Sequence, residues 1–106
     1  LFEAEDPRAC GIASLDESGR ITGFEEKPPH PKGNLANGGI YMLNAAIFDE
    51  VRWEFPFPID FGYHILPQLV GRMQGYRIHG LHMDIGTPES YAKAQKIYSC
   101  METELC

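Results

Sequence analysis

The sequence has few basic residues: 9 Lys and Arg face 15 Asp and Glu, which gives a net charge of −6 over 106 residues. That balance argues against a nucleic-acid partner, because such proteins usually present a basic face to the phosphates. No apolar run approaches the roughly 18–20 residues that span a bilayer, so we expect no membrane partner. The acidic first residues lack the basic segment of a signal peptide, and we expect none.

Cysteine is scarce and forms no familiar pattern. Cys10, Cys100 and Cys106 are an odd number, and no pair has zinc-ligand spacing. We therefore expect free thiols and a cytoplasmic location. The sequence also lacks a Gly-x-Ser-x-Gly elbow and a Gly-x-Gly-x-x-Gly loop, so it carries no signature of a serine hydrolase or a dinucleotide site.

Apolar residues are sufficient for a folded core. They make up 43% of the chain, and aromatic residues 11%, which is too many for a disordered protein. At this length the core is adequate but small, so we expect one domain or a piece of one. The first residue is not Met, as expected of a fragment.

The clearest local structure is a β-hairpin. Residues 10–16 and 20–26 favour strands, and Asp16 to Gly19 favour a turn in which the glycine is free to take a positive φ. Three closely spaced prolines then exclude a helix or a central strand, which predicts a loop at 27–33.

The rest of the chain alternates expected strands and helices. Apolar stretches at 40–43 and 75–85 favour strands, and apolar residues at helical spacing predict helices at 45–51, 61–73 and 88–98. This mixture predicts an α/β domain rather than an all-α or all-β one.

Glu26 and Lys27 come where the second hairpin strand meets the proline-rich loop. A lysine fixed there can present its ammonium group to a phosphate as a point charge. The neighbouring carboxylate can accept hydrogen bonds from sugar hydroxyls. The alternative is a charged strand end that is simply solvated.

Asn37, Gly38 and Gly39 precede the expected strand at 40–43. Glycines allow a ligand to approach the backbone closely, and the amide can donate and accept hydrogen bonds to a sugar. The alternative is a simple turn.

Asp84 ends the expected strand at 75–85. A carboxylate at this edge of an open α/β sheet, together with phosphates, is a common way to hold Mg²⁺. The alternative is that Asp84 caps the turn into the helix beside Thr87. Because Thr87 is the better-placed N-cap, we expect Asp84 to serve the metal.

The four histidines favour ordinary, partly buried side chains. On a strand, His79 and His82 would face opposite ways. His82 shares a face with Asp84, and could support it there.

Taken in chain order, several short motifs resemble the C-terminal half of the sugar-1-phosphate nucleotidylyltransferases. They are Cys10-Gly11-Ile12, Asp16-Glu17-Ser18-Gly19-Arg20-Ile21, Phe24-Glu25-Glu26-Lys27-Pro28, Asn37-Gly38-Gly39-Ile40-Tyr41, Asp60-Phe61, Leu66-Pro67 and Asp84-Ile85-Gly86-Thr87-Pro88-Glu89-Ser90-Tyr91. Their shared order is more specific than any one motif. Among subgroups, the sequence is most similar to the mannose- or heptose-1-phosphate guanylyltransferases.

The resemblance implies the C-terminal part of a Rossmann-like, three-layer α/β/α nucleotidyltransferase fold with a mixed sheet. It implies a reaction in which an NTP and a sugar 1-phosphate give an NDP-sugar and pyrophosphate, with Mg²⁺ as cofactor. Lys27 would bind the sugar phosphate and Asp84 the metal, and these two are the expected catalytic residues. The other expected substrate-binding residues are Gly11, Glu26, Asn37 and Gly39.

The family's glycine-rich nucleotide loop has no counterpart in this sequence. We therefore expect residues 1–106 to form a single partial domain that holds a sugar-phosphate site but no NTP site. Two functions stay open: a part of a transferase that works with its other half, or a remnant that binds sugar phosphate or a protein without catalysis. The expected assembly is a homodimer or a pairing with an N-terminal half.

Overall fold

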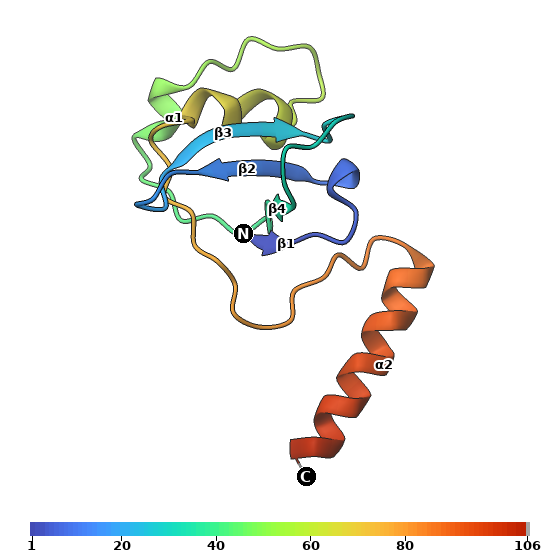
Figure 1. Cartoon of the computed structure of the whole chain (residues 1–106). Coiled ribbons are helices and arrows are strands. Elements are labelled where there is room, and N and C mark those ends of the chain that lie inside the picture. Colours follow the sequence, from blue (N-terminus) through green and yellow to red (C-terminus); the bar gives the residue numbers. More distant parts are fainter. Residues whose placement is uncertain (106) are drawn as a thin grey trace.

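The computed structural model describes residues 1–105 and contains one small sheet with short helices packed beside it (Figure 1). Its strand order is β1-β4-β2-β3, and every pairing between these strands is antiparallel. The strands are β1 (Phe2–Glu3), β2 (Gly11–Leu15), β3 (Ile21–Glu26) and β4 (Leu35–Ala36). The α/β class is confirmed, whereas the mixed sheet expected from the sequence is wrong for these strands.

A single contact outside the named strands has parallel geometry. Leu1 N donates to Tyr76 O at 2.6 Å, and Ile78 N donates to Leu1 O at 2.8 Å. In a parallel pair, one residue hydrogen-bonds to the two residues that flank its partner, as Leu1 does with the residues on either side of Arg77. The strand expected at 75–85 is reduced to this short contact, since no named strand forms there.

The predicted hairpin is confirmed as β2 and β3. Asp16 fixes its turn, because the Oδ1 atom accepts hydrogen bonds from Ser18 N at 2.9 Å and from Arg20 N at 3.0 Å. Gly19 has a φ of 84°, as the turn requires. The hairpin therefore forms from local turn chemistry and does not depend on distant parts of the chain.

The helices differ in length from the sequence-based expectation. They are η1 (Pro7–Ala9), α1 (Ile47–Glu50), η2 (Phe61–Ile65), η3 (Leu66–Leu69) and α2 (Pro88–Leu105). The helix predicted at 61–73 is instead a π turn followed by a 3₁₀ turn. Pro67 lacks an amide hydrogen, and Gly71 takes a φ of 86°, so neither supports a continuous α-helix.

The core consists of two small apolar clusters. One contains Ala4, Ile12 and Ala36 around the middle of the sheet. The other joins α1 to the 3₁₀ and π turns through three buried side chains, Val51, Ile65 and Leu69. The η2 and η3 turns contact β3, which places this second cluster beside the hairpin.

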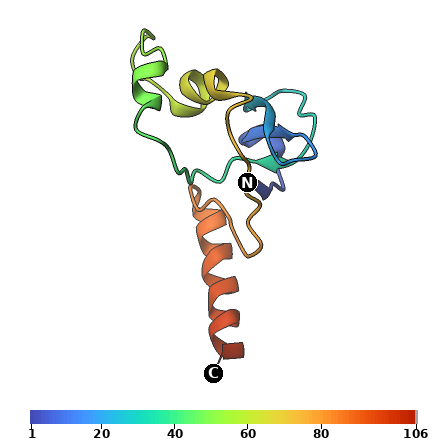
Figure 2. The same ribbon diagram turned by 90° about the vertical axis from the view of Figure 1, so that its left-hand side faces the viewer.

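Two segments lie outside the sheet and the helical turns that pack beside it. Helix α2 extends away from the sheet, so the three-layer arrangement expected from the resemblance is not formed within residues 1–105 (Figure 2). The strand expected at 40–43 is also wrong, since this segment is an extended loop whose Ile40 and Met42 are 78% and 100% exposed. A strand needs a neighbour to hydrogen-bond with, and this segment has none within the described residues.

Of the helices described in residues 1–105, none is both long and apolar enough to cross a membrane. Cys10 is half-buried and Cys100 is exposed, and both are free thiols as expected. The expectation for Cys106 concerns a position outside the described residues.

Candidate functional site

Glu26, the last residue of β3, is the centre of the candidate site. In the hairpin register it lies opposite Gly11, the first residue of β2. Its carboxylate packs over that glycine, because a Cβ added to Gly11 would come within 2.5 Å of Glu26 Oε2. Gly62 of η2 closes the other side, where an added Cβ would come within 2.9 Å of Glu26 Cδ. Neither position can accept a side chain while the carboxylate is in place.

Lys27 and Asn37 lie beside Glu26 because both are hydrogen-bonded to the start of β2. Lys27 N donates to Cys10 O at 2.9 Å, and Asn37 N donates to Gly11 O at 2.8 Å. Lys27 has a φ of 46°, which is an unfavourable conformation for a residue other than glycine. The structure thus gathers Gly11, Glu26, Lys27 and Asn37 at one end of β2, although the sequence spreads them over three segments.

The Asn37 side chain is engaged in a turn. Its Oδ1 accepts a hydrogen bond from Gly39 N at 2.9 Å, and its Nδ2 donates to the Tyr41 hydroxyl. Gly39 has a φ of 74°, which explains a glycine at this position. These bonds match the simple turn that the sequence left as an alternative, and the same turn keeps Asn37 beside Gly11.

The electrostatics of the site oppose ionisation of its acidic groups. Burial raises the pKa of the Glu26 carboxyl, and the negative charge of Asp60 raises it further, while Lys27 lowers it. Burial also raises the pKa of the Cys10 thiol, and nearby carboxylates, Asp84 among them, add to that rise. The negative charge of Asp84 thus acts on Cys10, the residue before Gly11.

Asp84 is exposed, and its Oδ1 accepts a hydrogen bond from Gly86 N at 2.8 Å. The N-cap of α2 is Thr87, as predicted, since Ser90 N donates to Thr87 Oγ1 at 3.1 Å. Asp84 thus closes the turn that leads into α2, which agrees with the alternative that the sequence left open, while Thr87 caps the helix itself. Within residues 1–105, no group of three His, Cys, Asp or Glu side chains gathers as a metal site. Asp84 can therefore offer one carboxylate to a metal, and no closed cage is formed within the described residues.

The histidines divide into two kinds. His64 and His82 are half-buried as predicted, whereas His30 and His79 are exposed, so the prediction of partial burial is wrong for these two. Sequence reasoning gave His64 no individual role. Its Nδ1 accepts a hydrogen bond from Asp60 N at 2.8 Å. The spacing of an N-cap residue and a polar residue four positions later could have found this pair.

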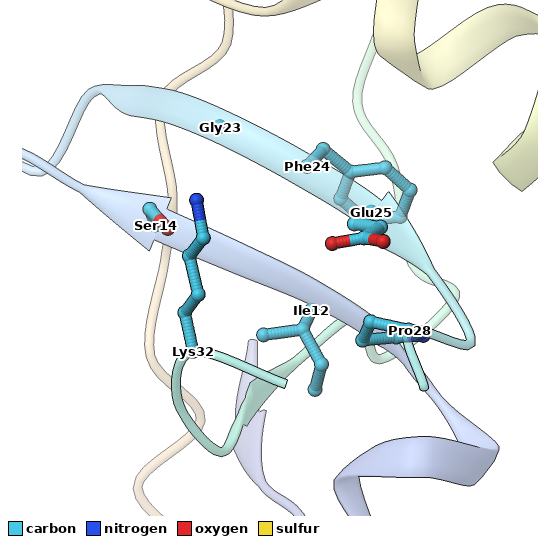
Figure 3. A pocket seen from close by; sticks show the side chains of 7 residues that line it. All are labelled: Ile12, Ser14, Gly23, Phe24, Glu25, Pro28 and Lys32. Carbon is cyan, nitrogen blue, oxygen red and sulfur yellow. The ribbon is translucent and has the colours of Figure 1, made fainter. Parts of the chain in front are cut away.

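A shallow hollow of about 220 Å³ lies mainly on the other face of the hairpin, over Ile12, Ser14, Gly23 and Glu25 (Figure 3). Lys32, from the loop after β3, extends back over β2 toward Ser14. The lining residues are Ile12, Ser14, Gly23, Phe24, Glu25, Pro28 and Lys32. None of the six residues predicted from the sequence lines this hollow, so the candidate site and the hollow are separate features.

Comparison with known proteins gives a family match over nearly the whole chain. The sequence profile of the nucleotidyl transferase family matches residues 1–100. A glucose-1-phosphate adenylyltransferase of Desulfitobacterium hafniense (strain DSM 10664 / DCB-2) is 39% identical over 97 residues, which cover 85% of this chain and 24% of that protein. A glucose-1-phosphate thymidylyltransferase of Streptomyces antibioticus is 48% identical over 52 residues, which cover 49% of this chain and 15% of that protein.

A third relative matches to nearly the same extent as the first. The glucose-1-phosphate adenylyltransferase of Thermotoga neapolitana (strain ATCC 49049 / DSM 4359 / NBRC 107923 / NS-E) is 37% identical over 98 residues, 85% of this chain and 23% of that protein. The chain thus spans at most about a quarter of the length of these relatives. All three are adenylyl- or thymidylyltransferases, so the resemblance to guanylyltransferases gains no support from them and stays a prediction.

Proposed function

This chain belongs to the nucleotidyl transferase family, and from that premise we propose that it forms the sugar-phosphate side of an active site that makes nucleotide sugars. In the proposed reaction, a phosphate oxygen of the sugar 1-phosphate attacks the α-phosphorus of a nucleoside triphosphate. The bond from that phosphorus to the bridging oxygen breaks, and pyrophosphate leaves. The rest of a longer protein, or another chain, would supply the nucleotide site.

The observation that carries this proposal is the meeting of Gly11, Glu26, Lys27 and Asn37 at one end of β2. Glu26 has lone pairs for sugar hydroxyls, and the glycines at positions 11 and 62 leave room for its carboxylate. Lys27 provides a positive charge one residue further on, which suits a phosphate. A neutral hydroxyl cluster and a dianion are the two ends of a sugar 1-phosphate.

Asp84 fits the proposed metal as one ligand among several. Its Oδ1 is used by Gly86 N, and no hydrogen bond to its Oδ2 is found within residues 1–105. Mg²⁺ is commonly held by one or two carboxylates together with substrate phosphates, so a single protein carboxylate is a suitable donor. The metal would offset the charge that develops on the transferred phosphoryl group.

Calorimetric titration of glucose 1-phosphate into the chain tests the proposal. We expect wild-type protein to bind, and Lys27→Met to bind roughly tenfold to hundredfold more weakly, because a charge-assisted contact is lost. Lys32→Met is the matched control, since Lys32 is an exposed lysine of the same loop that lies on the other face. Equal weakening by both variants, or unchanged affinity of Lys27→Met, would contradict the proposed phosphate contact.

The second candidate is sugar-phosphate binding without catalysis. It would need no glycine-rich loop with basic residues to hold a triphosphate, and residues 1–106 contain none. Pyrophosphate release separates the two functions: a binding remnant gives none with any NTP even after its proposed partner half is added, whereas a transferase half gains turnover.

A further inference from the structure

Two residues at the start of η2 lie close to Glu26: Asp60, which caps the turn, and Gly62 within it. A Cβ added to Gly62 would come within 3.3 Å of Asp60 Oδ1 and within 2.9 Å of Glu26 Cδ, so both carboxylates lie against the same glycine. The position of η2 therefore sets how closely Asp60 and Gly62 approach Glu26. Whatever holds this turn in place also sets the shape and charge of the candidate site.

His64 and Asp60 cap the turn reciprocally. Asp60 Oδ1 accepts a hydrogen bond from Tyr63 N at 2.8 Å, and His64 Nδ1 accepts one from Asp60 N at 2.8 Å. This arrangement resembles a capping box, with histidine in the place of the usual Glu or Gln and one residue further along. It satisfies two amide groups that a helical turn otherwise leaves unpaired.

The ring and backbone of His64 are themselves fixed. The ring stacks on Phe55 with centroids 4.6 Å apart and an interplanar angle of 23°. Gln68 Nε2 donates a hydrogen bond to His64 O at 2.8 Å. The side-chain amide of Gln68 also accepts a hydrogen bond from Arg52 N and donates one to Arg52 O. An imidazole held in this way keeps its acceptor nitrogen aimed at Asp60 N, which requires the neutral form with its proton on Nε2.

We infer that His64 is a positioning residue of the candidate site, acting through Asp60 and the η2 turn to hold Gly62 and Asp60 against Glu26. The inference rests on the proposed function only for the consequence on substrate, namely tighter sugar-phosphate binding. Its structural content stands on the hydrogen bonds of residues 60–64. Loss of the Nδ1 acceptor should let the turn move away from Glu26 and admit water.

Three variants test this inference in the 106-residue chain. His64→Leu removes the acceptor, His64→Asn restores an acceptor at similar reach, and His79→Leu is the control at an exposed histidine. By NMR we expect His64→Leu to speed hydrogen exchange at the Asp60 amide by roughly fivefold to tenfold. We also expect it to lower the pKa of Glu26 toward its usual value, while His64→Asn and His79→Leu keep both readouts near wild type.

Other outcomes overturn the inference. If His64→Leu leaves the Glu26 titration unchanged, or if His64→Asn behaves like His64→Leu, the acceptor has no positioning role. Should His64→Leu fail to fold, the tautomer of wild-type His64, read from its ring nitrogen shifts, decides: an Nδ1-protonated ring contradicts the inference, and an Nε2-protonated ring supports it. Absence of glucose 1-phosphate binding in wild type would refute the proposed function alone, because the NMR readouts do not use the ligand.

Discussion

Glu26 is a residue whose proposed role in binding and whose contribution to stability oppose each other. Its pKa is raised in the folded chain by burial and by Asp60, so the folded state binds the Glu26 proton more tightly than the unfolded state does. The stabilising effect of that proton is fully present below the unfolded pKa, near 4.5, and is lost as the pH rises through the higher folded value. At neutral pH the charged carboxylate therefore lowers the free energy of unfolding.

We accordingly expect Glu26→Gln to stabilise the fold at neutral pH and to weaken sugar-phosphate binding. The difference in free energy of unfolding between the variant and wild type should grow between about pH 4 and about pH 7. Only wild type has a carboxyl at this position, and its ionisation lowers the stability over that range. Urea unfolding at the two pH values measures this difference. Glu25→Gln removes an equal charge from an exposed neighbour and should show no comparable growth; a gain of the same size there would point to net charge instead.

At Lys27 too, the proposed role in binding and the contribution to stability oppose each other. Its φ of 46° is a conformation that glycine adopts without strain. We expect Lys27→Gly to raise the free energy of unfolding by about 1 kcal/mol and to weaken sugar-phosphate binding as much as Lys27→Met does, because the strain and the ammonium group are lost together. Lys32→Gly, in the same loop but without a positive φ, should be neutral or destabilising. Chemical unfolding of both variants checks the prediction, and equal effects would contradict it.

At the scale of the elements, the two ends of the hairpin differ in how much space they leave. Gly11 lies under the Glu26 carboxylate, whereas a Cβ added to Gly23 would meet Ser14 at an ordinary 3.5 Å. We expect Gly11→Ala to destabilise the chain by about 1–3 kcal/mol through overpacking. Gly23→Ala should be neutral or stabilise by up to about 1 kcal/mol, since alanine is favoured over glycine inside a strand. Thermal unfolding of the two variants tests the prediction. If both lose stability to a similar degree, lack of space is not the reason for a glycine at position 11.

The hairpin and the α2 start could be predicted from the sequence because their causes are local. Asp16 and Gly19 fix the turn, and Thr87 caps α2 through Ser90 N. The strand expected at 40–43 is wrong and the one at 75–85 is reduced to a short contact with Leu1, because a strand exists only where a neighbouring strand accepts its hydrogen bonds. Apolar content alone therefore identified segments that could pair as strands, without showing which strand they would pair with.

The candidate site was predictable only in part. Glu26 and Lys27 are adjacent in the sequence, Asn37 stands out beside two glycines, and the resemblance to a family added Gly11. The approach of Gly62 to Glu26 depends on η2 folding back over β3, which no local pattern reveals. His64 was overlooked for a similar reason, because the notable feature is its contact with Asp60 N rather than its residue type.

At the scale of the whole molecule, much apolar surface remains uncovered. Ile40 and Met42 are 78% and 100% exposed, and Leu81 and Ile85 are 56% and 53% exposed. Helix α2 extends from the sheet with Tyr98 62% exposed (Figure 2). Apolar surface of this extent marks an interface or a tendency to aggregate, and unpaired extended segments are templates for strand pairing.

We therefore expect the 106-residue chain to self-associate and to lack catalysis on its own. A symmetric dimer is the simplest assembly that pairs equivalent segments and covers residues 40–43 and 81–85. Turnover should be missing because a triphosphate has no basic, glycine-rich cradle here. Light scattering measures the mass of the assembly. The double variant Ile40→Lys, Met42→Lys should shift that mass toward the monomer. Met101→Lys, on α2, is the comparison because it lies outside these two segments. Pyrophosphate release is measured with each NTP and a panel of sugar 1-phosphates. A monomeric wild type would contradict the association, and steady turnover would contradict the missing catalysis.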